Sequence, residues 1–198
     1  VPAVRHALAG GDLDRAADLV EVATPALRRN RQEATLRRWV GDFPDEVLQR
    51  RPVLAIAFVG ALMSSNEFAD VARRLREIER QLPAIHERLA PDADPTAELA
   101  SQVVAVDEHE LARVPAAVEL YWAGLALVSG DLPATHLHAG RAINTATADD
   151  DVVPAGAAGL SGLAHWACGE LDEARRSYLT CIDGLLRAQH ISDALGSY

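Results

Sequence analysis

Hydrophobic residues recur every three or four positions along most of the chain, the spacing that gathers them on one face of an α-helix. The pattern is clearest at residues 155–190, where a run rich in alanine and glycine ends at Gly169 and a second helical run begins. The apolar stripe of the second run consists of Leu171, Ala174, Tyr178, Cys181, Ile182 and Leu185. We predict two helices joined by a tight turn, with the small residues of the first helix allowing the second to approach closely.

The turn at Gly169 has degenerate copies at three earlier places in the sequence. Each copy has a residue suited to left-handed backbone, then an acid that is expected to cap or charge the start of the next helix. The left-handed positions are Gly11, Asn66, Gly130 and Gly169. The last two are 39 residues apart, near the ~34-residue period of tetratricopeptide repeats. Because one hairpin is too thin to bury both of its sides, the copies predict a stack of hairpins.

The same periodicity predicts helices elsewhere, and we expect Pro25 to bend or split the helix that contains it. The expected helical ranges are 2–9, 13–30, 33–40, 44–50, 53–64, 68–82, 96–106 with Thr96 as N-cap, 107–114 (as a short helix or connector), 115–129 and 132–146. Residues 53–64 are apolar nearly all round, so that helix should be central. Residues 90–95 indicate a loop, and residues 149–151 indicate a solvated link and N-cap before the next helix. Aromatic residues make up only 5% of the chain and β-branched runs are short, which favours an all-α fold.

The length and charge of the chain narrow its functional class. Its 198 residues, 49% of them hydrophobic, suffice for one sizeable domain, and we expect a single one over residues 1–198. All 19 basic residues are arginine. Residues 1–90 hold 14 arginines against 13 acids, whereas residues 91–198 hold 5 arginines against 16 acids. The second half should therefore repel nucleic acid and anionic membranes.

The remaining composition indicates a cytoplasmic protein. Cys168 and Cys181 are expected at the ends of successive helices, too far apart to form a disulfide, and no signal peptide is evident. No apolar run is expected to approach the ~20 residues of a membrane span. The chain begins at Val1 and stops where a new helical pattern starts, which indicates a piece of a longer protein.

Several motifs, taken in order, resemble a known family over essentially the whole chain. They lie at residues 7–19, 36–39, 43–48, 51–54, 121–127, 162–174 and 187–196. Together they are similar to the helical-repeat region of large ATP-binding LuxR-type transcriptional regulators, the MalT-like proteins. The resemblance implies a tetratricopeptide-like right-handed superhelix that receives an inducer or a regulatory protein and takes part in self-association. It also implies an ATPase module upstream and a helix-turn-helix domain downstream.

Neither of those flanking modules is present in this sequence. Without lysine the chain cannot form a Gly-x-x-x-x-Gly-Lys-Ser/Thr phosphate loop, and it has no basic recognition-helix pattern. We therefore expect no cofactor in this piece, with ATP and DNA binding confined to other parts of a parent protein.

The residue patterns that suggest chemistry have simpler structural explanations. His136 and His138 are two apart on a helix and should face different directions rather than share a metal. Residues 107–110 could hold a cation but fit a solvated connector better. Ser161 lies mid-helix and outside a nucleophile elbow, and the arginines at 28–31 and 73–80 fit solvated helix faces. No nucleophile–base pair emerges, so we do not expect an enzyme.

Grooves of the predicted superhelix are the better place for a ligand. If the four turns are equivalent, the first helix of each hairpin lines the inner surface with Val53, Ile56, Gly60, Met63, Leu120, Gly124, Leu127, Gly159, Leu163 and Trp166. That surface is small and apolar, and it lacks the polar residues that clamp a peptide carboxylate. Our candidates for ligand contact, which otherwise belong to the core, are Met63, Tyr121, Trp122 and Trp166.

Two hypotheses about function follow. The first is an effector-sensing, protein-interaction and self-association segment of a MalT-like regulator, whose partner is a small molecule or a regulatory protein. The alternative is a stand-alone tetratricopeptide-type scaffold that only holds proteins together.

Overall fold

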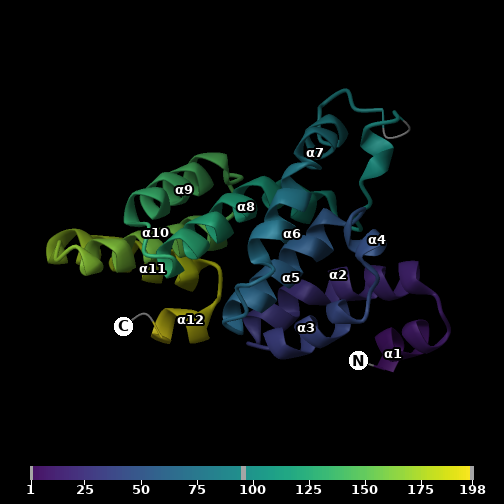
Figure 1. Ribbon diagram of the computed structural model, residues 1–198, viewed down its shortest axis with the longest axis horizontal. Helices are drawn as coiled ribbons and strands as arrows, with labels where there is room; N and C mark the ends of the chain where they lie inside the picture. Colours follow the sequence, from purple (N-terminus) through teal and green to yellow (C-terminus); the bar gives the residue numbers. More distant parts are fainter. Residues whose placement is uncertain (1, 95–96, 197–198) are drawn as a thin grey trace. The chain divides into compact units, whose positions relative to one another are not determined.

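The computed structural model describes residues 2–94 and 97–196 (Figure 1). Within those ranges all regular structure is helical and no strand is present, which confirms the all-α prediction. The tetratricopeptide-like superhelix stays a prediction. The chain divides into two compact units, Val1–Val114 and Pro115–Tyr198. Each unit is described by itself below, and the expectation of one repeat domain also stays a prediction.

The first unit is organised around one apolar helix. Its helices are α1 (Pro2–Ala9), α2 (Leu13–Arg29), α3 (Glu33–Gly41), α4 (Asp45–Leu48), α5 (Pro52–Ser64), α6 (Val71–Glu79), α7 (Leu82–Arg88), the 3₁₀ turn η1 (Ala100–Gln102) and the start of α8 (Glu108–Val128). Helices α2, α3, α4 and α6 all contact α5. Every residue of α5 from Pro52 to Leu62 is buried except Gly60, so the expectation of a central helix is confirmed.

The second unit contains the predicted hairpin. It comprises the rest of α8, then α9 (Leu132–Thr145), α10 (Val152–Ala167), α11 (Leu171–Arg187) and α12 (Ile191–Gly196). Helix α10 packs against both α9 and α11. A Cβ added at Gly159 would lie 3.1 Å from Cys181 Sγ, and one added at Gly184 would lie 2.8 Å from Ala155 Cβ. The small residues therefore permit the close approach that the sequence predicted, although Leu171 of the predicted stripe is exposed.

All four predicted left-handed positions have positive φ angles. The angles are 72° at Gly11, 58° at Asn66, 77° at Gly130 and 79° at Gly169. Each turn closes in the same way: at the last, Gly169 N donates to Trp166 O at 3.0 Å and Glu170 N donates to His165 O at 2.9 Å. These two bonds satisfy carbonyls that the end of a helix would otherwise leave without partners.

Two further turns of this type escape the sequence pattern. Arg31 has φ 54° between α2 and α3, and Gln189 has φ 60° between α11 and α12. Both close with the same long bond, from Gln32 N to Leu27 O at 2.8 Å and from His190 N to Leu185 O at 2.9 Å. Arginine and glutamine rarely adopt left-handed backbone, so neither residue signals such a turn in the sequence.

The acids after these turns cap helices only where the side chain is short. Asp12 accepts from Arg15 N at 3.1 Å, and Asp131 accepts from Ala134 N at 3.0 Å. Glu170 does not cap α11; its carboxylate lies 2.5 Å from His165 Nδ1 instead. Of the two expectations for residues 149–151, solvation is wrong at Asp150, whereas a side-chain cap at the start of the next helix is present. Asp150 is buried and its carboxylate accepts from Val152 N and Val153 N at the start of α10.

Between residues 68 and 107 the structure departs from the predicted helices. Helix α6 begins at Val71 and ends at Glu79, and α7 begins separately at Leu82. The proposed N-cap Thr96 lies outside the described residues. From residue 97 to the start of α8, the only helical turn in the described chain is η1. Other elements hold this segment through its backbone, because Val104 N donates to Arg50 O at 2.7 Å and Val106 N donates to Glu21 Oε2 at 3.1 Å.

Two prolines are accommodated inside continuous helices. Helix α8 runs through Pro115 and α2 runs through Pro25, so the expected break at Pro115 and the split at Pro25 are wrong, whereas the bend at Pro25 stays a prediction. A proline removes one intrahelical donor, and packing of the residues on both sides can offset that loss. Val114 and Ala116 are buried beside Pro115, and Thr24 is buried beside Pro25.

The uninterrupted α8 changes one expectation about membranes. With 21 residues it is, by length and composition, the one helix in the described chain that is long and apolar enough to cross a bilayer. The expectation that no apolar run approaches that length is therefore wrong. The folded chain buries 44% of this apolar stretch. Core helices of soluble proteins have the same properties, so α8 is weak evidence for a membrane span.

Candidate functional site

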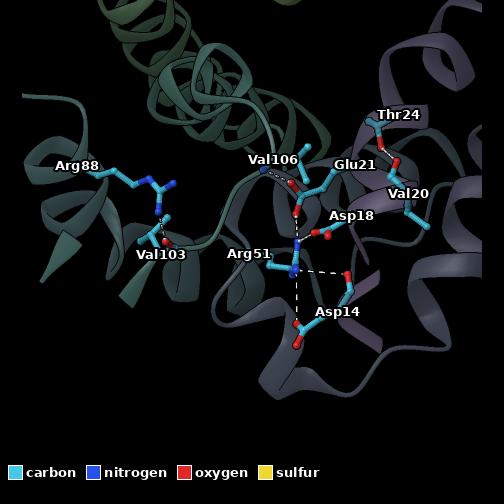
Figure 2. A network of polar contacts seen from close by, with 9 residues as sticks. All are labelled: Asp14, Asp18, Val20, Glu21, Thr24, Arg51, Arg88, Val103 and Val106. Atoms are coloured by element: carbon cyan, nitrogen blue, oxygen red, sulfur yellow. Dashed lines mark hydrogen bonds and ion pairs between the residues drawn. The ribbon is translucent and has the colours of Figure 1, made fainter. Parts of the chain in front are cut away.

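The most heavily buried charge cluster of the first unit surrounds Arg51, which directly precedes α5 and is only 3% exposed (Figure 2). Its Nη1 lies 2.7 Å from Asp18 Oδ1 and 3.1 Å from Glu21 Oε1. Its Nη2 lies 3.4 Å from both the carbonyl and the carboxylate of Asp14. The three acids are spaced i, i+4 and i+7 on α2, which puts them on one face of that helix. Three carboxylates therefore share one guanidinium.

Glu21 connects this cluster to a distant part of the chain. The residue is 5% exposed, and its second oxygen accepts from Val106 N, 85 residues away, at 3.1 Å. Burial raises the pKa of Glu21, and the bonds from Val106 and Arg51 act in the opposite direction. Glu21 thus holds α2, the start of α5 and the segment before α8 together (Figure 2).

Arg88 anchors the same segment at a second point. Its Nη1 donates to Val103 O at 2.6 Å, and its Nη2 lies 2.6 Å from Glu108 Oε1. The backbone around residues 103–108 is therefore fixed from two sides, by α2 and by α7.

A cleft of about 240 Å³ opens beside Glu21. Its walls combine apolar side chains with carboxylates, contributed by Glu21, Val22, Pro25, Val53, Val106, Asp107 and Glu110. Val22 is 66% exposed and Val106 is 46% exposed, which is unusual for valines. Apolar walls with a few polar groups are typical of small-molecule sites. The Asp107–Glu110 stretch, predicted to be a solvated connector, thus forms part of a cleft wall.

The carboxylates of the cleft have contacts within the chain as well. Glu110 Oε1 lies 3.0 Å from Arg113 Nη1, and Asp107 Oδ1 accepts from His109 N at 2.9 Å. These bonds fix the two side chains at the wall, so the cleft is formed before any ligand binds.

The predicted ligand-contact residues lie elsewhere. Met63 is half-buried on α5 in the first unit and does not line the cleft. The other three are in the second unit, where Tyr121 and Trp122 are half-buried on α8 and Trp166 is 64% exposed on α10. Trp122 stacks on His138 with ring centroids 6.2 Å apart. The role of these four residues in binding stays a prediction.

The predicted inner surface mixes buried and open positions. Val53 and Ile56 are buried and Gly60 and Met63 are half-buried, whereas Leu163 and Trp166 are exposed. The turns are thus equivalent in backbone geometry, but the residues before them are not equivalent in exposure.

The two histidines of α9 contact different partners, as their spacing predicts. The ring of His136 lies 4.4 Å from that of His165, whereas His138 Nδ1 lies 2.6 Å from Glu119 Oε2. Burial lowers the pKa of His136, the neighbouring His165 lowers it further, and Glu170 opposes both. In the described residues no three His, Cys, Asp or Glu side chains are grouped so that they could hold a metal ion.

The arginine face of α6 is exposed at Arg73, Arg76 and Arg80, as a solvated helix face would be, and it also makes ion pairs within the chain. Arg73 lies 2.7 Å from Asp70 and 2.6 Å from Glu77. Arg74 lies 2.9 Å from Asp70 and covers the ring of Phe58 at 4.7 Å. Through these contacts, Arg73 and Arg74 take part in the fold of the first unit.

Sequence reasoning missed the Arg51 cluster and the cleft, although part of the signal was available. Acids at Asp14, Asp18 and Glu21 recur with helical spacing, and Glu21 sits between two valines. An acid among apolar residues on an amphipathic helix indicates a buried partner. Nothing in the local pattern identifies that partner as Arg51.

Comparison with known proteins adds no relative. No protein-family model matches the sequence, and no curated protein or solved structure is significantly similar to it. The cleft and the charge cluster must therefore be interpreted from their own geometry.

Proposed function

We propose that this chain is the effector-sensing and protein-interaction segment of a MalT-like LuxR-family regulator. The observation that carries the proposal is the preformed cleft beside Glu21, with its apolar walls and three carboxylates. A small-molecule effector binds there, and a regulatory protein or a second copy of the chain binds elsewhere on the helical surface. ATP and DNA would be bound by other modules of the parent protein. The setting is cytoplasmic.

The repeated helix ends support this proposal. Within the described residues, turns of one type join successive helices at Gly11, Arg31, Asn66, Gly130, Gly169 and Gln189. Pairs of helices joined by a turn recur in the same way in helical-repeat proteins, whose surfaces bind other molecules. The resemblance of the sequence to the MalT-like repeat region points the same way.

The position of Glu21 suggests how the effector acts. A ligand at the cleft wall touches a residue that holds α2, Arg51 and the backbone at Val106 together. Any preference of the ligand for one arrangement of these three segments would shift the first unit towards that arrangement. This is the coupling that an effector-sensing segment needs.

The stand-alone scaffold remains the second candidate, and a specific observation favours it. Several large apolar side chains of the second unit are exposed, namely Val128, Leu137, Ile143, Leu163, Trp166, Leu171, Leu179, Leu186, Ile191 and Leu195. Where such side chains form one continuous patch, they mark contacts with other proteins. The sequences that flank this segment in its gene separate the two candidates, since only the regulator requires a phosphate loop upstream and a helix-turn-helix downstream.

A direct test blocks the cleft. Val22→Trp fills it from an exposed position and should leave the fold intact, whereas Leu99→Trp places the same bulk at an exposed leucine outside the cleft. We expect compounds that raise the melting temperature of the unmodified chain to lose their effect on Val22→Trp and keep it on Leu99→Trp. Thermal shift with a small-molecule collection measures this. Equal shifts in both variants would mean that the cleft is not the effector site.

A further inference from the structure

We propose that the cleft beside Glu21 selects an organic cation, an ammonium or guanidinium group on a short aliphatic stem. This inference rests on the proposed function, because it names the chemistry of the effector that the cleft receives.

The charge of the walls favours a positive ligand. Glu21, Asp107 and Glu110 all contribute to the lining, and no basic residue does. Behind Glu21, the guanidinium of Arg51 is shared by three carboxylates, so it cannot neutralise them all. Arg113 offsets Glu110 in part. The net field in the cleft is negative, and a cation entering a partly desolvated site gains more from it than in open water.

The apolar wall distinguishes an organic cation from a bare metal ion. Four of the seven lining residues are Val22, Pro25, Val53 and Val106, which offer contact area to carbon atoms but no ligand atoms to a metal. The exposed Val22 gains most from being covered, because it has the most apolar area to remove from water. A stem that covers Val22 and Val106 while its charged head faces Asp107 and Glu110 uses both kinds of wall.

The size of the cleft limits the stem. Its volume of about 240 Å³ lies below the roughly 300–1,000 Å³ of pockets that hold drug-sized ligands. The cleft therefore suits a small head group on a short stem rather than a drug-sized ligand. Both a free amine and the lysine or arginine side chain of a partner peptide have this chemistry.

The test uses the full chain and four matched probes in isothermal titration calorimetry near neutral pH: n-butylammonium, n-butylguanidinium, n-butanol and butyrate. We expect the two cations to bind more tightly than the neutral and anionic probes, and binding to weaken with added salt. Lysine amide acetylated at its α-amino group and a blocked lysine-containing tripeptide form two further arms. They distinguish a small-molecule source of the cation from a protein source.

Two variants locate the binding. Glu110→Gln removes one charge at the wall and should weaken cation binding roughly tenfold. Glu87→Gln, an exposed glutamate on α7 outside the cleft, should leave it unchanged. Val22→Trp should abolish it. If Glu87→Gln weakens cation binding as much as Glu110→Gln does, or if Val22→Trp still binds the cations fully, the binding is nonspecific attraction. Either result would overturn the inference.

The outcomes also separate this inference from the proposed function. If butanol, butyrate or a screened neutral compound occupies the cleft and Val22→Trp blocks it, the cleft is an effector site but not for cations. If none of the four probes binds, the cation inference is wrong. If no screened compound shows an effect that Val22→Trp removes, the proposed effector site fails as well.

Discussion

Two buried charged residues, Arg51 and Glu21, hold several elements of the first unit together. Arg51 and Glu21 are both almost completely buried. Besides contacting each other, Arg51 contacts Asp18, and Glu21 accepts a hydrogen bond from Val106 N. Taking two ions out of water costs several kcal/mol each, so such a pair is tolerated only when its hydrogen bonds are complete. The cost is highest when one partner is removed, because the other is left as a buried charge.

Replacing Arg51 with alanine tests this point. We expect Arg51→Ala to lower the free energy of unfolding by about 3–5 kcal/mol, since Glu21 loses its buried counter-charge. The neighbouring Arg50 is exposed, so Arg50→Ala is a matched control that should change stability by no more than about 0.5 kcal/mol. Denaturant titration of both variants measures the difference. Equal effects would mean that the charge of Arg51 contributes no more than an exposed one.

A pH dependence follows from His136. Its pKa is lowered from the ordinary 6.5 by burial and by the adjacent His165, with Glu170 opposing. As pH falls below that value, the unfolded chain takes up the proton before the folded chain does, so stability decreases until the folded-state pKa is passed. We expect the unmodified chain to lose more stability than His136→Gln between about pH 7.5 and about pH 5.5. Parallel stability curves for the two proteins would refute this assignment.

At the scale of elements, the pairing of α10 with α11 depends on positions without side chains. The backbone at Gly184 lies so close to α10 that a Cβ there would meet Ala155 Cβ at 2.8 Å and Asp151 O at 3.3 Å. Gly140 of α9 provides the contrast. Apart from the neighbouring residues and backbone of its own helix, no heavy atom lies within 4 Å of a Cβ added there. The two glycines are both helical, but only one is needed for packing.

The same substitution should therefore have opposite effects at these two sites. We expect Gly184→Ala to destabilise the chain by about 1–3 kcal/mol through overpacking. Gly140→Ala should stabilise it by up to about 1 kcal/mol, the difference in helix propensity between the two residues. Thermal and denaturant unfolding measure both changes. If Gly184→Ala is neutral or stabilising, the helices are not as closely packed as the hairpin requires.

Helix ends were the most predictable elements and helix interiors near proline the least. A glycine or asparagine before an acid identified four left-handed turns, because the steric cost of that backbone is local. The turns at Arg31 and Gln189 had no such marker and depend on the packing of the helices on either side. Helices α2 and α8 likewise continue through proline because neighbouring residues are buried, which no local rule contains.

At the scale of the whole molecule, the net charge of a sequence segment does not show where the fold brings charged side chains together. The excess negative charge lies in residues 91–198, and two of the three acids of the cleft, Asp107 and Glu110, belong to that part of the sequence, whereas Glu21 does not. The local arrangement of three acids around a small opening decides where a cation gains most.

The sequence by itself determined the helical content, the apolar central helix α5, the close-packed α10–α11 hairpin and the four glycine or asparagine turns. Each of these follows from interactions between residues close in the chain or from composition, and both are visible in the pattern. Only the tertiary structure decided that Arg51 is the residue that neutralises Glu21 and where the segment before α8 is held. It also decided that a cleft opens beside Glu21. Those features join residues as far apart as Glu21 and Val106. The free energy of such a contact depends on how the intervening chain folds, which no local spacing encodes.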